Sequence, residues 1–264
     1  MFKVIACDLD GTLLDAHHGV GALSSDVIRA VVARGVRFVI ATGRHVSDAA
    51  GFCAQIGIAS ELITCNGARV HDASGQVTYR QDLPAELVRE LSHPALARGS
   101  VINLFTDDEW LIDRELARPH IPAAANSLGC RIHDPQAIDR DGIAKLFYIG
   151  VPSVLLEIER DLRSSFGDRI HIAFSLDDCL EVMAPGVNKG RALAAILEAE
   201  GISPAECLAF GDGMNDVEML QVAGKAVVMG NASPRVKAAL PALEVIGSHR
   251  DEAMAHYVRR LYQL

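Results

Sequence analysis

Residues 4–12, VIACDLDGT, decide how the rest of the chain is interpreted. An apolar run of strand length ends in Asp8 and Asp10, and Gly11 then lets the backbone turn sharply. Two carboxylates about 5 Å apart repel each other by roughly 3 kcal/mol at an effective dielectric constant of about 20, so a cation between them would be stabilising. Asp and Gly are also ordinary turn residues, and this stretch alone is equally compatible with a solvated acidic turn.

A second stretch with the same features favours the cation site. Residues 207–216, CLAFGDGMND, form another short apolar run that breaks into glycine and the carboxylates Asp212 and Asp216. Between the two stretches, apolar runs at 36–41 and 61–64 end in small or polar residues, TGR and CNG. This recurring ending indicates several strands that deliver polar groups to one place.

The order of these elements predicts a parallel sheet. A helix beginning at Ser24 or Ser25 and running to about Ala33 separates the first two strands, and a second helix precedes the strand at 61–64. The resulting β-α-β-α-β order, with strands apolar on both faces, is typical of an α/β fold with a Rossmann-like parallel sheet covered by helices. The carboxyl ends of such strands share one edge, and ligands bind there.

The middle of the chain has a different pattern and predicts a separate module. From residue 84 to 185, hairpin and helix patterns alternate, and they include a helix near 115–128. Antiparallel hairpins backed by helices are typical of an α+β unit. The α/β pattern then resumes with Lys189, which stands at the start of a helix. We therefore expect a core domain of residues 1–83 and 186–264 and an inserted α+β domain of residues 84–185.

Composition excludes several classes of partner. The 264 residues are 50% hydrophobic and 22% charged, with a net charge of −9, and no basic stripe offsets this negative field. Nucleic acid and anionic membranes are therefore not expected as partners. The six cysteines form no Cys-x-x-Cys pair and are interpreted as small buried residues in a reducing cytosol. The N-terminus lacks a signal-peptide pattern and no apolar run approaches about 18 residues, so we expect a soluble cytoplasmic protein without an obligate protein partner.

Placed at one sheet edge, the polar strand ends make a chemically coherent site. It would contain carboxylates, a hydroxyl, an amide, a glycine and a lysine, namely Asp8, Asp10, Thr42, Gly43, Asp212, Asn215, Asp216 and Lys189. Carboxylate oxygens suit a hard cation, and Mg²⁺ is expected because it needs only a few of them and keeps phosphate or water oxygens in its other positions. A carboxylate beside a metal-bound phosphate can attack phosphorus and form an aspartyl-phosphate.

Four groups of residues resemble, in this order, the motifs of the haloacid-dehalogenase-like (HAD) phosphatases. They are Asp8-Leu9-Asp10-Gly11-Thr12, Ala41-Thr42-Gly43-Arg44, Lys189, and Gly211-Asp212-Gly213-Met214-Asn215-Asp216 followed by Glu218-Met219-Leu220. The large insert after the second motif, together with Cys65-Asn66-Gly67-Ala68, resembles the Cof-type branch, subfamily IIB, with a type C2B cap. The resemblance covers essentially the whole chain. It implies that the insert is a cap domain that closes over the substrate.

The resemblance also implies a role for each residue of the site. Asp8 would be the nucleophile and a Mg²⁺ ligand, and Asp212 would be the second carboxylate ligand. Asp10 would act as general acid and then as general base, while its backbone carbonyl binds the metal. The phosphoryl oxygens would be held by Thr42, Asn215, Lys189 and the amides of Leu9 and Gly43. Asp216 would order a metal-bound water or Lys189, and Arg44 would either face the site or form a structural salt bridge.

The expected activity is Mg²⁺-dependent hydrolysis of phosphomonoesters of small metabolites, such as sugar phosphates or pyridoxal phosphate. Three alternatives share parts of the pattern. A phosphomutase would use the same aspartyl-phosphate chemistry, and a phosphatase for sucrose or mannosylglycerate phosphates would differ only in the cap. A non-catalytic phosphate-binding protein would have no use for an acid beside the nucleophile, so the presence of both Asp8 and Asp10 argues against it. Neither the physiological substrate nor the oligomeric state follows from the sequence.

Overall fold

The computed structural model describes residues 1–114, 129–138 and 141–264. These residues form two compact units, one made of Met1–Thr78 and Asn188–Leu264 and the other of Tyr79–Val187. The second unit is thus inserted into the sequence of the first, and its ends lie a few residues from the predicted bounds at 84 and 185. The helix predicted near 115–128 lies outside the described residues.

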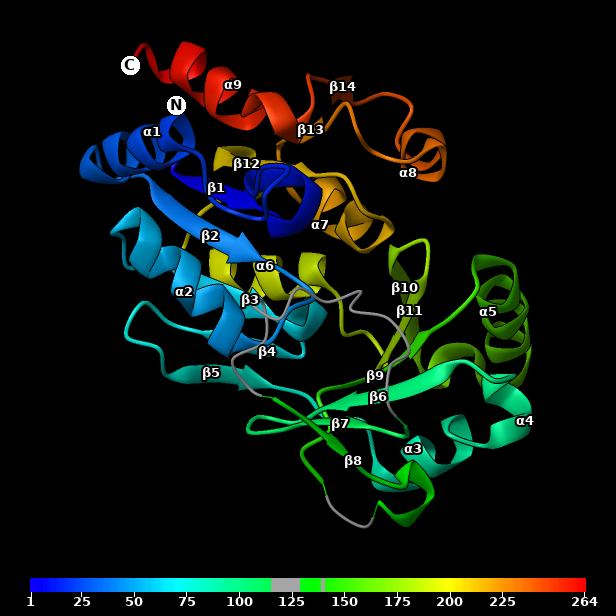
Figure 1. Ribbon diagram of the computed structural model, residues 1–264. Helices are drawn as coiled ribbons and strands as arrows, with labels where there is room; N and C mark the ends of the chain where they lie inside the picture. Colours follow the sequence, from blue (N-terminus) through cyan, green and yellow to red (C-terminus); the bar gives the residue numbers. More distant parts are fainter. Residues whose placement is uncertain (115–128, 139–140) are drawn as a thin grey trace. The chain divides into compact units, whose positions relative to one another are not determined.

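The first unit is built on one mainly parallel sheet. Within the described residues its strand order is β14-β13-β12-β1-β2-β3-β4-β5 (Figure 1). The strands are β1 (Val4–Cys7), β2 (Arg37–Ala41), β3 (Glu61–Thr64), β4 (Arg69–His71), β5 (Val77–Arg80), β12 (Cys207–Gly211), β13 (Lys225–Val228) and β14 (Glu244–Val245). All strands from β14 to β3 are parallel, and β4 runs antiparallel to β3.

Helices cover both faces of this sheet because successive residues of its strands point into two different apolar cores. Ile5 and Cys7 of β1 contribute to one core, together with side chains from α1 (Ala22–Ala33), α2 (Val46–Ile56) and α9 (Ala253–Tyr262). Val4 and Ala6 contribute to the other, together with side chains from α6 (Lys189–Ala199), α7 (Val217–Val222) and α8 (Pro234–Ala239). This three-layer arrangement confirms the predicted α/β class.

The order β12-β1-β2 places a topological switch point beside β1. After β1 the chain adds β2 and β3 on one side, and it later returns to add β12 on the other. Cys7, the last residue of β1, is paired with both Ile40 and Phe210, and the amide of Asp8 donates to the carbonyl oxygen of Phe210 at 3.1 Å. The segments after β1 and β12 therefore leave the sheet side by side, where ligands bind in open α/β sheets.

Helix α1 begins at Ala22, so the predicted start at Ser24 or Ser25 is wrong. Both serines are buried within the helix. The amide of Ser24 donates instead to Oε2 of Glu252 at 2.7 Å, a carboxylate from the residue before α9. A negative charge beside the first amides of a helix is favourable, because those amides lack partners inside the helix. This cap is remote in the sequence, and a local pattern cannot reveal it.

The second unit is an α+β module. In its described part the sheet order is β10-β11-β9-β6-β7-β8, and all neighbours are antiparallel except β7 and β8. The strands are β6 (Val101–Phe105), β7 (Trp110–Ile112), β8 (Cys130–Ile132), β9 (Lys145–Ile149), β10 (His171–Leu176) and β11 (Cys179–Met183). The helices are α3 (Ala85–Leu91), α4 (Pro94–Ala97) and α5 (Pro152–Phe166).

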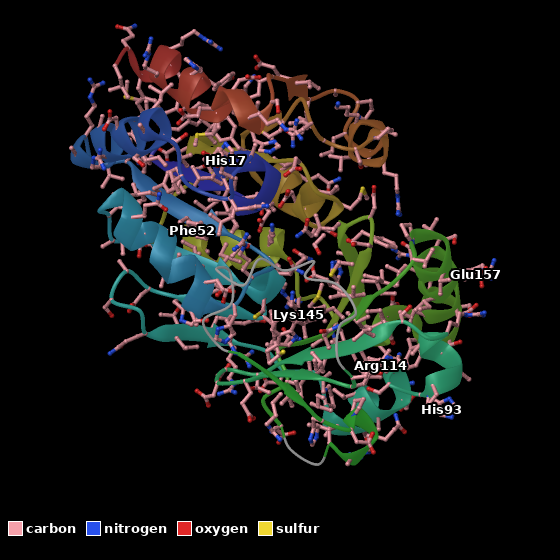
Figure 2. All side chains as sticks on the ribbon, in the orientation of Figure 1. His17, Phe52, His93, Arg114, Lys145 and Glu157 are labelled. Atoms are coloured by element: carbon pink, nitrogen blue, oxygen red, sulfur yellow. The ribbon has the colours of Figure 1, made fainter. Side chains whose placement is uncertain are left out.

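A buried ion pair lies on this second sheet. Lys145 of β9 (Figure 2) pairs with Glu181 of β11, and both side chains are almost fully buried. The Lys145 ammonium also lies over the rings of Phe105 and Phe147, 4.9 and 4.7 Å from their centroids. Trp110 stacks on Phe147 as a core residue. A buried charge needs partners of this kind, because removing one leaves the other unpaired in a medium of low dielectric constant.

The cysteines and the helices bear on the expected location of the protein. All six cysteines lie in the described residues, and none is part of a disulfide. Cys130 is exposed at an edge strand, so the interpretation of every cysteine as a buried residue is wrong at this position. No helix in the described ranges is long and apolar enough to cross a membrane. The cytoplasmic location stays a prediction.

Gly67 and Gly35 form a matched pair for testing close backbone packing in the first unit. Both have φ in the left-handed region, +97° and +83°, which costs other residues about 1–2 kcal/mol. A Cβ at Gly67 would lie 2.5 Å from the carbonyl oxygen of Asn188, whereas one at Gly35 would meet nothing within 4 Å. We expect Gly35→Ala to lower the free energy of unfolding in urea by about 1 kcal/mol and Gly67→Ala by about 3 kcal/mol. Equal losses would contradict the close approach.

Candidate active site

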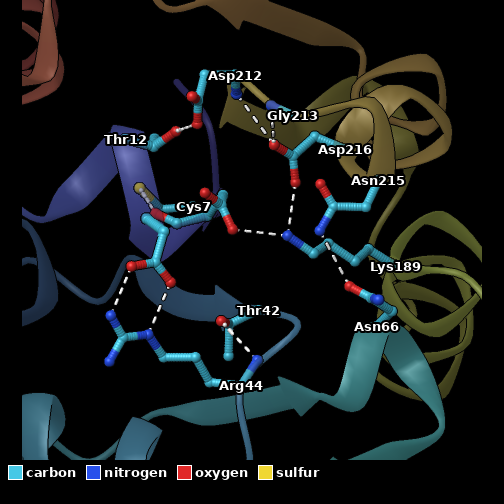
Figure 3. A network of polar contacts seen from close by, with 12 residues as sticks. Cys7, Thr12, Thr42, Arg44, Asn66, Lys189, Asp212, Gly213, Asn215 and Asp216 are labelled. Atoms are coloured by element: carbon cyan, nitrogen blue, oxygen red, sulfur yellow. Dashed lines mark hydrogen bonds and ion pairs between the residues drawn. The ribbon is translucent and has the colours of Figure 1, made fainter. Parts of the chain in front are cut away.

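Several segments of the first unit bring the predicted site residues to the carboxyl edge of its sheet (Figure 3). Asp8 follows β1, Thr42 follows β2 and Asp212 follows β12. Lys189 is the first residue of α6, and Asp216 lies in the short turn that precedes α7. Because neighbouring parallel strands end at the same edge, residues that are remote in the sequence meet here.

Lys189 links these segments at the centre of the site. Its ammonium nitrogen lies 2.6 Å from Oδ1 of Asp8 and 2.6 Å from Oδ1 of Asp216. The lysine side chain is fully buried, and those of Asp8 and Asp216 are only 8% and 0% exposed. Charges removed from water are tolerated when they are paired and hydrogen-bonded. The lysine therefore fixes the distance between the segment after β1 and the turn before α7.

Burial and mutual repulsion shift the ionisation of this cluster. Burial raises the pKa of Asp8 well above its ordinary value, and the Asp216 carboxylate raises it further, while Lys189 acts in the opposite direction. The pKa of Asp212 is raised to about 7 by burial and by Asp216, although the hydroxyl of Thr12 lowers it in part. Burial alone would lower the pKa of Lys189, but the carboxylates of Asp216 and Asp8 raise it, so the lysine stays charged.

The second oxygen of Asp216 shapes the loop after β12. Oδ2 accepts hydrogen bonds from the amides of Asp212 and Gly213 at 3.0 and 2.9 Å (Figure 3). Gly211 allows this approach, because a Cβ at its position would lie 2.6 Å from Cβ of Asp216. Asp216 thus contacts Lys189 with one oxygen and holds the Asp212 loop with the other. Whether it also orders a metal-bound water stays a prediction.

Asp212 is held against the loop that follows β1. The hydroxyl of Thr12 donates to Oδ1 of Asp212 at 3.0 Å. Gly11 has φ of +79° and lies beside the same carboxylate, where a Cβ would be 2.3 Å from Oδ2. Both the backbone conformation and the lack of space therefore require glycine at this position.

The carboxylates of Asp8, Asp212 and Asp216 could hold a metal ion. One oxygen from each lies within 4.8 Å of the others. Together with Lys189, three carboxylates and one ammonium sum to a charge of −2 when all are ionised. The donors are all oxygen, which suits a hard divalent cation, and its charge would cancel this excess. The residues present therefore fit such an ion.

The carboxylate of Asp10 contacts Arg44. The guanidinium donates from Nε to Oδ2 at 2.7 Å and from Nη2 to Oδ1 at 2.5 Å, a bidentate geometry that orients both partners. The guanidinium also lies 5.4 Å from the ring centroid of Phe52, a residue of α2 (Figure 2). Of the two interpretations left open for Arg44, the structure contains the salt bridge, and its partner is the predicted acid–base residue.

Thr42 and Asn215, two predicted phosphate ligands, are linked through Asn66. The backbone amide of Asn66 donates to the carbonyl oxygen of Thr42 at 3.0 Å. The side-chain Oδ1 of Asn66 accepts a hydrogen bond from Nδ2 of Asn215 at 3.0 Å. Cys65 and Asn66 both have positive φ, 48° and 57°, and such strain persists only where surrounding contacts enforce it. This corner of the chain therefore fixes both phosphate-binding candidates relative to each other.

The other predicted phosphate ligands are placed by their neighbours in the sequence. Leu9 is buried in the turn that directly follows Asp8, and Gly43 stands between Thr42 and Arg44. The structure thus brings the predicted residues to one edge of one sheet, with the Asp10 carboxylate directed to a partner of its own. Their roles in a reaction stay predictions.

Two asparagines at this site were not predicted from the sequence as site residues. Asn66 was noted only as part of a motif, because the turn signal of an Asn-Gly pair does not reveal Asn215 as a partner. Asn231 was not predicted, although its side-chain amide donates to Oδ2 of Asp212 at 3.1 Å. It follows β13 after Met229 and Gly230. An apolar strand followed by glycine and a polar residue is the same signal that identifies Asp212, which follows Gly211.

Comparisons with known proteins agree on the family. A model of the haloacid dehalogenase-like hydrolase family matches residues 5–258. The HMP-PP phosphatase of Serratia proteamaculans is 38% identical, over 98% of this chain and 95% of its own length. A solved haloacid dehalogenase-like hydrolase from Bacteroides thetaiotaomicron has a TM-score of 0.83 at 26% identity, covering 99% of this chain and 100% of that one. A HAD subclass IIB sugar phosphatase shares the fold, with a TM-score of 0.83, 22% identity and coverage of 99% and 100%.

The chain belongs to the haloacid dehalogenase-like hydrolases, because the family model matches nearly its whole length. Within this family it is a phosphatase of the Cof type, and its structural neighbours include the subclass IIB. The family expected from the four motifs is therefore confirmed.

The raised pKa values predict that metal binding releases protons in a pH-dependent way. In the metal-free protein the Asp212 carboxyl, with a pKa of about 7, keeps its proton at pH 6 and loses it by pH 8.5. Because its pKa is raised on folding, its contribution to stability is lost as pH rises from about 4 to about 7. We expect binding of Mg²⁺ to release more protons at pH 6 than at pH 8.5, because Asp212 is already ionised at the higher pH, measured by calorimetry in buffers of different ionisation enthalpy.

Thr12→Val is the matched variant for this measurement. It removes the hydroxyl that lowers the pKa of Asp212 while keeping the shape of the side chain. The pH midpoint of proton release should therefore move upward. Identical proton release at both pH values in the wild-type protein would contradict the raised pKa.

Proposed function

We propose that the protein is a Mg²⁺-dependent phosphomonoester hydrolase that acts on small phosphorylated metabolites through an aspartyl-phosphate intermediate on Asp8. The observation that carries this proposal is the position of Asp8. Its buried carboxylate lies 2.6 Å from the Lys189 ammonium and belongs to the acidic group that could hold a divalent ion. A carboxylate nucleophile in contact with a fixed cation is suited to receive a phosphoryl group. Membership of the family supports the same class of reaction.

The first step transfers the phosphoryl group to Asp8. A carboxylate oxygen of Asp8 attacks phosphorus, the bond between phosphorus and the ester oxygen breaks, and protonated Asp10 gives its proton to the leaving alcohol. In the second step Asp10 takes a proton from water, the water oxygen attacks phosphorus, the bond between phosphorus and the Asp8 oxygen breaks, and inorganic phosphate leaves while Asp8 is restored as a carboxylate. In both steps the phosphoryl oxygens are held by Lys189, Thr42, Asn215 and the amides of Leu9 and Gly43.

Asp8, Asp212 and the backbone carbonyl of Asp10 would hold the Mg²⁺ ion. When bound, the ion supplies positive charge that stabilises the phosphoryl oxygens and offsets the acidic cluster. Mg²⁺ is favoured over Ca²⁺ because two carboxylates and a carbonyl leave positions for water and phosphate oxygens, whereas Ca²⁺ takes more ligands in a looser geometry.

The substrate is proposed to be a small phosphorylated metabolite. The Serratia relative is named an HMP-PP phosphatase and a fold neighbour is named a sugar phosphatase, and both names support this class. The inserted unit, Tyr79–Val187, is proposed to select the alcohol part of the substrate. A panel of sugar phosphates, pyridoxal phosphate and HMP-PP, assayed with and without Mg²⁺, would identify which compound of this class is the preferred substrate. An isomerised product that requires a bisphosphate activator would instead indicate a phosphomutase.

Substitution of the two aspartates tests the proposed chemistry. We expect Asp8→Asn to lower kcat for an aryl phosphate by about 10⁴-fold or more, because the amide is not a nucleophile. Asp10→Asn should lower it by about 10²- to 10⁴-fold, the usual contribution of a general acid or base. Asp26→Asn is the control, since Asp26 is an exposed residue of α1. Wild-type turnover by Asp8→Asn, measured as phosphate release, would exclude Asp8 as the nucleophile.

The contact between Arg44 and Asp10 gives a further prediction about leaving groups. Arg44→Lys keeps the positive charge but loses the bidentate geometry that orients Asp10. In single-turnover assays we expect the rate to fall about 10-fold for an alkyl phosphate, whose leaving group needs a proton, and about 2-fold for p-nitrophenyl phosphate, whose leaving group does not. Arg29→Lys, at an exposed residue of α1, should change neither rate. Equal losses for both substrates would show that Arg44 does not act through Asp10.

A further inference from the structure

Asn231 connects three segments of the first unit through one side-chain amide. Its Nδ2 donates to the carbonyl oxygen of Gly11 at 2.8 Å and to Oδ2 of Asp212 at 3.1 Å. Its Oδ1 accepts a hydrogen bond from the amide of His249 at 3.0 Å. The two N–H donors of the amide are thus both used, although the residue lies at the surface. An exposed side chain whose amide makes hydrogen bonds through both its nitrogen and its oxygen has a specific structural or functional role.

The chemical nature of its partners determines which end of the Asn231 side-chain amide faces them. The Gly11 carbonyl oxygen and the Asp212 carboxylate oxygen are both acceptors, so only the nitrogen of Asn231 can face them. A carboxylate at this position would repel Asp212, and alanine or serine would be too short to reach both partners. Asparagine is therefore matched to bridging one carboxylate and one carbonyl while it also accepts from the His249 amide.

The bridge completes the restraint on Asp212. Thr12 donates to Oδ1 of Asp212 at 3.0 Å, and Asn231 donates to Oδ2. One donor on each oxygen fixes the plane of the carboxylate as well as its position. Each carboxylate oxygen has two lone pairs, so a donor on one of them leaves the other available for a cation. The same side-chain amide also donates to the carbonyl oxygen of Gly11, so it fixes the position of the loop after Asp8 relative to Asp212.

We propose that Asn231 is a positioning residue for the metal site and holds the Asp212 carboxylate in the orientation that binds a divalent ion. This inference rests on the proposed function, because it takes Asp212 as a metal ligand. Groups that hydrogen-bond to metal ligands typically change metal affinity by about 10- to 100-fold when they are removed. Since Asn231 makes no part of the proposed phosphoryl transfer, its loss should weaken metal binding more than it slows the loaded enzyme.

A purely structural role is the competing explanation, because Asn231 also anchors the segment that begins at His249. His249→Pro separates the two roles. It removes the backbone N–H that donates to Oδ1, together with the imidazole of His249, and does not alter the Nδ2 contacts of Asn231 with Gly11 and Asp212. Proline is tolerated here, because residue 249 is the first residue of a short helical turn and Ser248 before it is extended, with φ −79° and ψ 153°.

The test compares the affinity of the full-length protein for Mg²⁺ alone, by calorimetry, in the wild type, Asn231→Ala and His249→Pro. We expect Asn231→Ala to raise the Kd for Mg²⁺ about 10-fold or more and to keep kcat at saturating Mg²⁺ within about 3-fold of the wild-type value. His249→Pro should keep the Kd within about 2-fold. Circular dichroism melting curves verify that both variants are folded.

Three results would overturn the inference, and they can be told apart. An unchanged Kd in Asn231→Ala would show that Asp212 needs no such support. Equal weakening in Asn231→Ala and His249→Pro would assign Asn231 to the structure of the loop. Absence of Mg²⁺ binding to the wild-type protein would remove the proposed metal role of Asp212, and with it both the proposed cofactor and the task assigned to Asn231.

Discussion

One buried ammonium group constrains the whole candidate active site. Lys189 lies 2.6 Å from a carboxylate that follows β1 and 2.6 Å from another in the turn before α7. These charges are stable away from water only at such distances. Helix α6 must therefore begin where its first side chain reaches both carboxylates, and the loops after β1 and β12 must lie side by side. The pairing of β1 with β12 satisfies this requirement through the backbone.

The charge balance separates this cluster from an ordinary structural ion pair. A structural pair is neutral, whereas here two carboxylates contact one lysine and a third, that of Asp212, lies in the same acidic cluster. Repulsion and burial oppose that arrangement, as the pKa of about 7 for Asp212 shows. The protein maintains it with Thr12 on one oxygen of Asp212, Asn231 on the other, and a glycine where any side chain would collide. Perturbed groups held together in this way are typical of functional sites.

The sequence predicts the sheet, its covering helices and most residues of the candidate site, because these follow from local patterns. An apolar run that ends in Asp8 or Asp212 carries its own signal, and parallel topology then brings the two together. The contacts that orient these residues were not predictable. Asn231 contacts the carbonyl oxygen of Gly11, 220 residues away, and Glu252 contacts the amide of Ser24, 228 residues away. No local pattern in one sequence indicates such pairs. Arg44 is an intermediate case. The sequence identified its motif but not its partner, which the structure shows to be Asp10.

The interrupted first unit has a consequence for the order in which the chain can fold during synthesis. The central strand β1 needs β12 beside it, and α1 receives its cap from Glu252. These partners leave the ribosome late, whereas Tyr79–Val187 forms a continuous unit whose own contacts are complete much earlier. Contacts between remote segments also form slowly. The first strand and the first helix therefore lack these partners until the inserted unit has been synthesised.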